Sequence, residues 1–275
     1  MSPEFGNQSR DAGRLFRLLA RFGYVSKALV YLIIGYIAAR AAIIGKGKAT
    51  DEEGALLTIL KQPFGRVLLA VIAAGLFSYA LWRFAEAFLD PEGKEEKGSR
   101  PWARFQFGIS ALAYSALGVE AVRMILGHTS KSGGDKDAKE QAGLLLSLPF
   151  GHWLTIAIAA FAIICGLSEL YKAVERKFED QWQLEGLGRT TKPWVLRLGR
   201  VGVFARAIVG TVVGGYFLLA GLRQSPSEVR GTGGAIESLA DRPFGIWILA
   251  MIALGLIAYG LYTLAEARYR KMGTS

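Results

Sequence analysis

The chain has 275 residues, 52% of them apolar, yet it carries a formal net charge of +10. A mean hydropathy of +0.29 together with this charge is typical of a protein whose apolar residues cross a membrane and whose charged residues lie in the connections. The single cysteine, Cys165, excludes an intrachain disulfide.

Six apolar runs follow one another along the chain, and each is long enough to cross a bilayer. They cover residues 22–44, 67–89, 105–126, 153–173, 203–222 and 246–267. Because about 20 helical residues span a hydrocarbon core of about 30 Å, the sequence predicts an all-α membrane protein with six transmembrane helices. The alternative, a soluble bundle of very apolar helices, is disfavoured by six runs of membrane length in succession.

The tripeptide Pro-Phe-Gly occurs three times, each time just before the second apolar run of a pair. The copies are Pro63-Phe64-Gly65, Pro149-Phe150-Gly151 and Pro243-Phe244-Gly245. Sequence on both sides of each copy also recurs, which indicates an internal repeat. We therefore predict three tandem helical hairpins in a pseudo-threefold arrangement about the membrane normal.

Each Pro-Phe-Gly predicts a structural corner and not a chemical site. The proline suits the first turn of the following helix, where its missing N–H costs nothing, and the glycine lets the chain bend closely. We expect the phenylalanine to plug the joint. The segments before the corners, residues 54–60, 142–148 and 234–239, are predicted to form short interfacial helices.

The polar, Gly- and Pro-containing connections divide the chain. Residues 1–13 are predicted to be a disordered N-terminal tail, followed by repeat 1 (14–90), repeat 2 (101–178), a cytoplasmic linker (179–196) and repeat 3 (197–271). In the connection over residues 175–200 we expect the fourth transmembrane helix to continue into the cytoplasm. Trp182 and Trp194 are expected to anchor the remainder at the membrane surface.

Lysines and arginines near the ends of the apolar runs are more numerous on the side that holds both termini. By the positive-inside rule both termini should be cytoplasmic. The basic charge is then explained by topology and by anionic lipid at the cytoplasmic face of the bilayer. Nucleic acid is not expected as a partner, because its recognition needs a basic patch interleaved with stacking aromatic residues.

One face of each helix recurs from repeat to repeat, at a spacing of about four residues. On the first helices this face carries Lys27, Tyr31 and Gly35, then Ser110, Tyr114 and Gly118, then Arg206, Gly210 and Gly214. On the second helices it carries Gly75, Tyr79, Arg83 and Glu86, then Phe161, Cys165, Glu169 and Lys172, then Gly255, Tyr259, Thr263 and Glu266. The small residues predict contact faces, with Gly210 and Gly214 as a close-approach pattern.

Charged residues inside the runs need partners, because an ionised group in a bilayer costs at least ~2.5–3.5 kcal/mol on insertion scales. We predict that Lys27 pairs with Glu86 and Arg206 with Glu266, since each base and acid have similar depth in one hairpin. Glu120 is expected to pair with Arg123 on the same helix. Such pairs either fix helix packing or belong to a path for an ion, a proton or an anionic substrate. The candidate intramembrane polar layer is Lys27, Glu86, Glu120, Glu169, Lys172, Arg206 and Glu266.

Catalytic and metal-binding motifs are absent from the sequence. His128 and His152 have no acidic neighbour at ligand spacing, and Cys165 has no adjacent histidine. We expect no enzyme activity and no cofactor. Two function classes stay open: permeation of a small ion or small solute, which requires a hydrated route, or a membrane scaffold or accessory protein without transport activity, which would dock an unknown protein partner through its cytoplasmic loops.

Four features combine into one pattern. They are a basic residue early in the first helix, a Gly-Ala pair, Pro-Phe-Gly and a Gly-x-x-x-Tyr helix ending in Ala-Glu-Ala. This pattern resembles the domain of unknown function 1206 family of bacterial integral membrane proteins. The resemblance covers residues 14–270, and repeat 2 departs from it at Ser110, Phe161 and Lys172. It implies three tandem two-helix units in the bacterial inner membrane and no particular activity.

Overall fold

The computed structural model describes residues 3–44, 50–89, 100–128, 134–175, 188, 191–241 and 243–270. Long helices in this part of the chain are α1 (Pro3–Ile44), α3 (Gly65–Leu89), α4 (Arg100–Ile125), α6 (Gly151–Val174), α7 (Thr191–Arg223) and α9 (Gly245–Tyr269). Shorter ones are α2 (Glu52–Leu60), α5 (Gly134–Leu146), the 3-10 turn η2 (Pro226–Glu228) and α8 (Thr232–Ala240). All six long helices are long and apolar enough to cross a membrane. The predicted all-α fold with six transmembrane helices is confirmed, and the protein is a multi-pass membrane protein.

Three predicted boundaries differ from the structure. The helix α1 begins at Pro3, so the segment predicted to be a disordered tail is helical from residue 3; a proline suits a first turn because its missing N–H would be unpaired there. The helix α7 begins inside the predicted linker and includes an exposed Trp194. The predicted continuation of the fourth transmembrane helix is wrong, because Glu175 is extended and ends α6. Trp182 lies outside the described residues.

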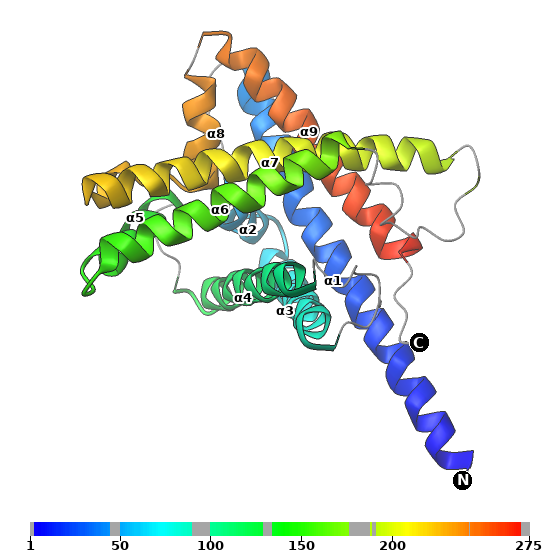
Figure 1. Cartoon of the computed structure of the whole chain (residues 1–275). Helices are drawn as coiled ribbons and strands as arrows, with labels where there is room; N and C mark the ends of the chain where they lie inside the picture. The colour runs from blue at the N-terminus through cyan, green and yellow to red at the C-terminus, as the bar shows by residue number, and fades with distance from the viewer. Residues whose placement is uncertain are drawn as a thin grey trace.

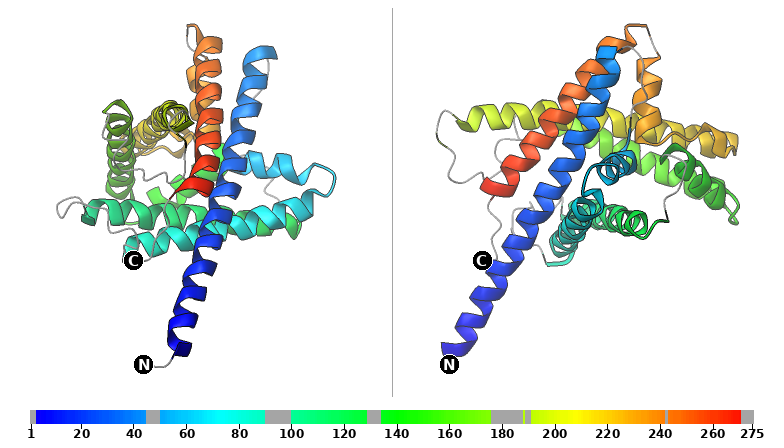
Figure 2. Two further views of the ribbon diagram at one scale, coloured as in Figure 1. Left: turned by 90° about the vertical axis from the view of Figure 1, so that its right-hand side faces the viewer. Right: turned by 180° about the vertical axis from the view of Figure 1, so that it is seen from behind.

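The long helices pack in three pairs, and each pair joins two different repeats. The helix α3 lies along α4, α6 along α7, and α9 along α1, so the last pair joins the third repeat to the first (Figure 1). Both views in Figure 2 show α1 and α9 side by side, with α3 and α4 crossing them steeply.

One contact recurs in all three pairs, where a glycine of one helix leaves room for a side chain of its neighbour. A Cβ atom placed on the glycine would lie 2.7 Å from Ile257 at Gly35, 3.0 Å from Phe77 at Gly118 and 2.8 Å from Ile163 at Gly214. The glycines occupy equivalent positions in the three repeats, and so do their three partners. This repetition supports the pseudo-threefold arrangement.

Glycines also allow the two helices of one repeat to cross closely in repeats 1 and 3. A Cβ on Gly23 would overlap the backbone of Tyr79, and one on Gly202 would overlap the backbone of Tyr259. By contrast, the space next to Gly210 is open, with no atom within 4 Å of a Cβ there. The prediction that Gly210 forms a close helix contact is therefore wrong.

Repeat 2 lacks these close crossings, because bulky residues replace the glycines. Gln106 stands where the other repeats have Gly23 and Gly202, and its amide donates a hydrogen bond of 3.4 Å to Cys165 Sγ. Phe161 packs its ring 5.1 Å from that of Phe105. These side chains hold α4 and α6 further apart than the corresponding helices of the other two repeats.

The Pro-Phe-Gly corners place each phenylalanine in an unusual position. Phe64, Phe150 and Phe244 have φ angles of 60°, 61° and 63°, a left-handed conformation that costs a non-glycine residue about 1–2 kcal/mol. Their side chains are 85%, 79% and 80% exposed, so the predicted plugging role is wrong. The second helix of each repeat starts at the glycine, because the left-handed phenylalanine separates it from the proline. The proline therefore lies in the preceding turn and not in the first helical turn.

A short helix was predicted before each corner and α2, α5 and α8 stand there, although α5 covers Gly134–Leu146 and not the predicted 142–148; each buries one side against the bundle. Ala55 and Leu56 in α2 and Ala235 and Ile236 in α8 are fully buried. Asp51 caps α2 by accepting a 2.8 Å hydrogen bond from the Gly54 amide. Asp135, from α5 of repeat 2, accepts bonds of 2.7 and 3.2 Å from the amides of Gly231 and Gly234 at the start of α8. These helices thus link repeats on the side away from the termini.

Candidate functional site

Lys27 lies at the centre of the bundle inside a cage of tyrosines. Its side chain is 4% exposed, and Nζ donates a 2.9 Å hydrogen bond to the Tyr79 hydroxyl. The same Nζ lies 4.7, 5.5 and 5.2 Å from the ring centroids of Tyr79, Tyr114 and Tyr259. Rings at this distance attract a cation through their quadrupoles. No carboxylate among the described residues lies within salt-bridge distance of Lys27.

A network of charged residues continues from this cage toward the end that holds the termini. The Arg83 guanidinium donates from Nε to the Tyr79 hydroxyl at 2.7 Å and forms an ion pair of 2.7 Å with Glu86. The other carboxylate oxygen of Glu86 lies 2.8 Å from Arg270. Arg270 also pairs with Glu266 at 3.2 Å and donates a short hydrogen bond to Tyr24. This network ties α3, α9 and α1 together.

A second network lies on the opposite side of the cage. Arg206 forms an ion pair of 2.9 Å with Glu169, and its Nε donates a 3.2 Å hydrogen bond to the Tyr31 hydroxyl. Tyr31 in turn donates a 3.2 Å hydrogen bond to Glu52 in the short helix α2. Burial raises the pKa of the Glu52 carboxyl above its ordinary value, since loss of solvent disfavours the charged form.

The ring of Tyr259 contacts both networks. Its centroid lies 5.2 Å from Lys27 Nζ and 5.4 Å from the Arg206 guanidinium. Together the networks and the cage form a line of polar side chains through the bundle, which we call the polar file. Its members, in order, are Glu52, Tyr31, Arg206 with Glu169, Lys27, Tyr79, Arg83, Glu86, Arg270 and Glu266.

The structure contradicts both ion pairs predicted within hairpins. Lys27 bonds to Tyr79 and not to Glu86, while Arg206 pairs with Glu169 and not with Glu266. Glu86 is instead held by Arg83, three residues before it on the same helix, and by Arg270. The i, i+3 spacing of Arg83 and Glu86 is the signal that could have identified the first of these partners.

Two other residues of the candidate polar layer lie apart from the polar file. Glu120 pairs with Arg123 at 3.7 Å, which confirms the predicted local pair, and Lys172 is half-buried near the end of α6. Sequence reasoning missed Tyr79 as a bonding partner, as well as Glu52 and Arg270. In the described part of the chain, no three His, Cys, Asp or Glu side chains come together in a way that could hold a metal ion.

Comparisons with known proteins divide the chain in the same way as the structure does. Residues 22–90, 105–176 and 201–270 each match the family model described as Domain of Unknown Function (DUF1206). The chain is 32% identical over 254 residues to "Uncharacterized protein YxxB" of Bacillus subtilis (strain 168), covering 92% of this chain and 90% of that protein. No solved structure matches the chain.

Proposed function

The chain belongs to the family described as Domain of Unknown Function (DUF1206), and we propose that it lets small ions or small polar solutes pass through its three-repeat bundle. The observation that carries this proposal is the polar file, which runs from Glu52 on one side to Arg270 on the other. Ionised groups are expensive at membrane depth, and those that occur there mark ion or proton pathways in many membrane proteins.

In this conformation the centre of the file is closed. Tyr31, Tyr79, Tyr114 and Tyr259 are all buried, and their rings pack edge to face, with centroids 4.6 Å apart for Tyr79 and Tyr114. Passage of anything larger than a proton therefore requires these rings to move.

Flux measurements on protein reconstituted in liposomes test this function. We expect wild-type liposomes to pass protons, K⁺, Na⁺ or Cl⁻ faster than protein-free liposomes under an imposed gradient. Lys27→Met should lower the rate by about tenfold or more, because raising a barrier by ~1.4 kcal/mol already has that effect. The matched control is Lys192→Met, at an exposed position at the start of α7. Wild-type liposomes that equal protein-free ones under every gradient would exclude permeation.

We further propose that the protein lies in the bacterial inner membrane with both termini in the cytoplasm, as the distribution of Lys and Arg favours. In a chain carrying Cys165→Ser, a membrane-impermeant thiol reagent should label Lys136→Cys and Arg230→Cys in intact cells. Gly188→Cys should react only after the cells are opened. The reverse pattern would overturn the orientation while leaving the fold unaffected.

A further inference from the structure

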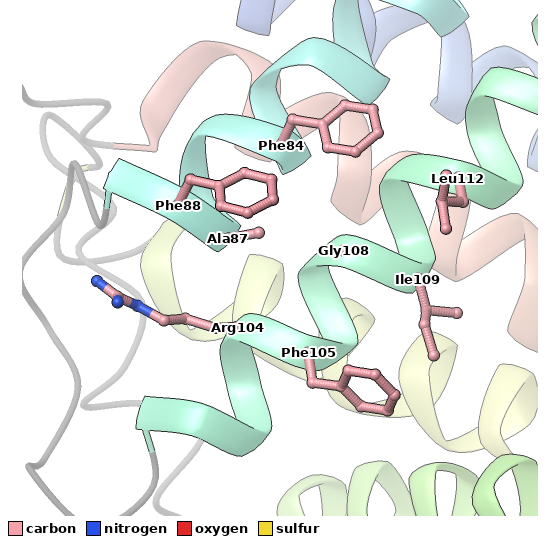
Figure 3. A pocket seen from close by; sticks show the side chains of 8 residues that line it. All are labelled: Phe84, Ala87, Phe88, Arg104, Phe105, Gly108, Ile109 and Leu112. Atoms are coloured by element: carbon pink, nitrogen blue, oxygen red, sulfur yellow. The ribbon is translucent and has the colours of Figure 1, made fainter.

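An apolar groove of about 410 Å³ lies on the outer surface of the bundle between α3 and α4. Figure 3 shows Phe88 on one wall and Phe105 and Leu112 on the other. All three side chains are more than half exposed. Because these helices cross the membrane, the groove is open to lipid chains and not to water.

One end of the groove carries a charge. Arg104 lies near the start of α4, at the end where Phe88 lies (Figure 3). Its Nε atom is buried and has no hydrogen-bond partner, and no described carboxylate forms an ion pair with it. Nε itself is enclosed by protein, but the Arg104 side chain as a whole is only partly buried and lines the groove, so its guanidinium suits a ligand that brings an anionic oxygen.

The floor of the groove is also unfilled. A Cβ atom on Gly108 would meet no other atom within 4 Å. Gly210 and Gly215 of α7 are equally open, but Gly108 lines the groove, so the open space there adds room for an occupant from outside the protein. An unbranched apolar chain fits a groove between two antiparallel helices.

We propose that this groove binds an anionic phospholipid, with one acyl chain lying along Phe88, Phe105 and Leu112 and the phosphate accepting hydrogen bonds from the Arg104 guanidinium. Arginine suits this role because its planar fork matches the geometry of a phosphate. Arg104 is also close to a helix end, the depth at which headgroups lie. The inference depends on the membrane location of α3 and α4 and is independent of the proposed permeation.

Native mass spectrometry of the detergent-solubilised protein, titrated with phosphatidylglycerol or phosphatidylcholine, tests the site. Wild-type protein should retain phosphatidylglycerol in preference to phosphatidylcholine by about tenfold, as expected for charge-assisted hydrogen bonds to phosphate. Arg104→Gln should remove this preference. Arg123→Gln, at the other end of α4, should preserve it.

Filling the groove tests the position of the acyl chain. Gly108→Leu should reduce retention of both lipids, and since a Cβ at this position meets no atom within 4 Å and the leucine extends into the groove, folding should be preserved. Gly215→Leu is the matched control, because a Cβ at Gly215 in α7 also meets nothing within 4 Å. Unchanged headgroup preference in Arg104→Gln, or equal retention by Gly108→Leu and Gly215→Leu, would overturn the proposal.

Discussion

Glu86→Gln is expected to lower the free energy of unfolding by about 2–3 kcal/mol. Glu86 is buried and pairs with both Arg83 and Arg270, so its loss removes the carboxylate of Arg83 and one of the carboxylates that hold Arg270, which keeps Glu266. Breaking a buried pair costs about 3–5 kcal/mol in soluble proteins, whereas polar contacts in membranes average ~0.6 kcal/mol. The expected value lies between these because two partners are affected. Reversible unfolding by SDS in mixed micelles measures it.

Double-mutant cycles then identify the partners of Glu86. The coupling free energy with Arg270→Met should exceed about 1 kcal/mol, and the coupling with Lys27→Met should be within about 0.5 kcal/mol of zero, as for residues that share no direct contact. Glu120→Gln is the control, because its partner Arg123 is largely exposed and such pairs contribute little. A larger coupling with Lys27 than with Arg270 would restore the pairing predicted within the hairpin.

Replacing a corner glycine by alanine should destabilise the protein by about 3 kcal/mol or more, the upper end of the range for overpacking. A Cβ on Gly65, Gly151 or Gly245 would overlap the carbonyl oxygen of Leu60, Leu145 or Ala240. These oxygens belong to the backbone of the preceding short helix, so they cannot rotate away. The corner would have to open and separate the short helix from the bundle.

The matched control for the corners is Gly215→Ala in α7. A Cβ there has open space, and alanine favours a helix over glycine by about 0.8–1.0 kcal/mol. We therefore expect Gly215→Ala to be neutral or stabilising in the same SDS titration. Corner variants as stable as Gly215→Ala would show that the close approach at the corners is not required.

The spans and corners were predictable from sequence because hydropathy and Pro-Phe-Gly are local signals. The ion pairs were not, because hydropathy determines how deep a residue lies and not toward which neighbour it turns. In the structure Lys27 lies beside Tyr79, seven residues before Glu86 on α3, and α9 brings Arg270 to the glutamate. The exposure of Phe64 was unpredictable for a related reason, since only its left-handed backbone turns the ring outward.

Repeat 2 differs from the other two repeats at several positions, and the structure shows the effect of these differences, which the sequence alone did not. Phe161 and Lys172 were recognised as differences from the other repeats, but their effect depends on what faces them. In the structure Phe161 and Gln106 occupy the crossing that glycines leave open elsewhere. The threefold pattern therefore holds for the pairs between repeats and fails for the crossing within repeat 2.

The pairing of α1 with α9 has a consequence for how the protein is made. A ribosome delivers the α1 segment to the membrane first, and its principal partner α9 follows only after the four long helices α3, α4, α6 and α7 have been inserted. During that interval the surface of α1 around Gly35, which α9 later covers, faces lipid or the insertion machinery. Since contacts between segments far apart in sequence form late, the packing of α9 against α1 is the final step of assembly. Arg270, at the end of α9, then joins Glu86 and Tyr24, so these two contacts form only after the last helix has packed.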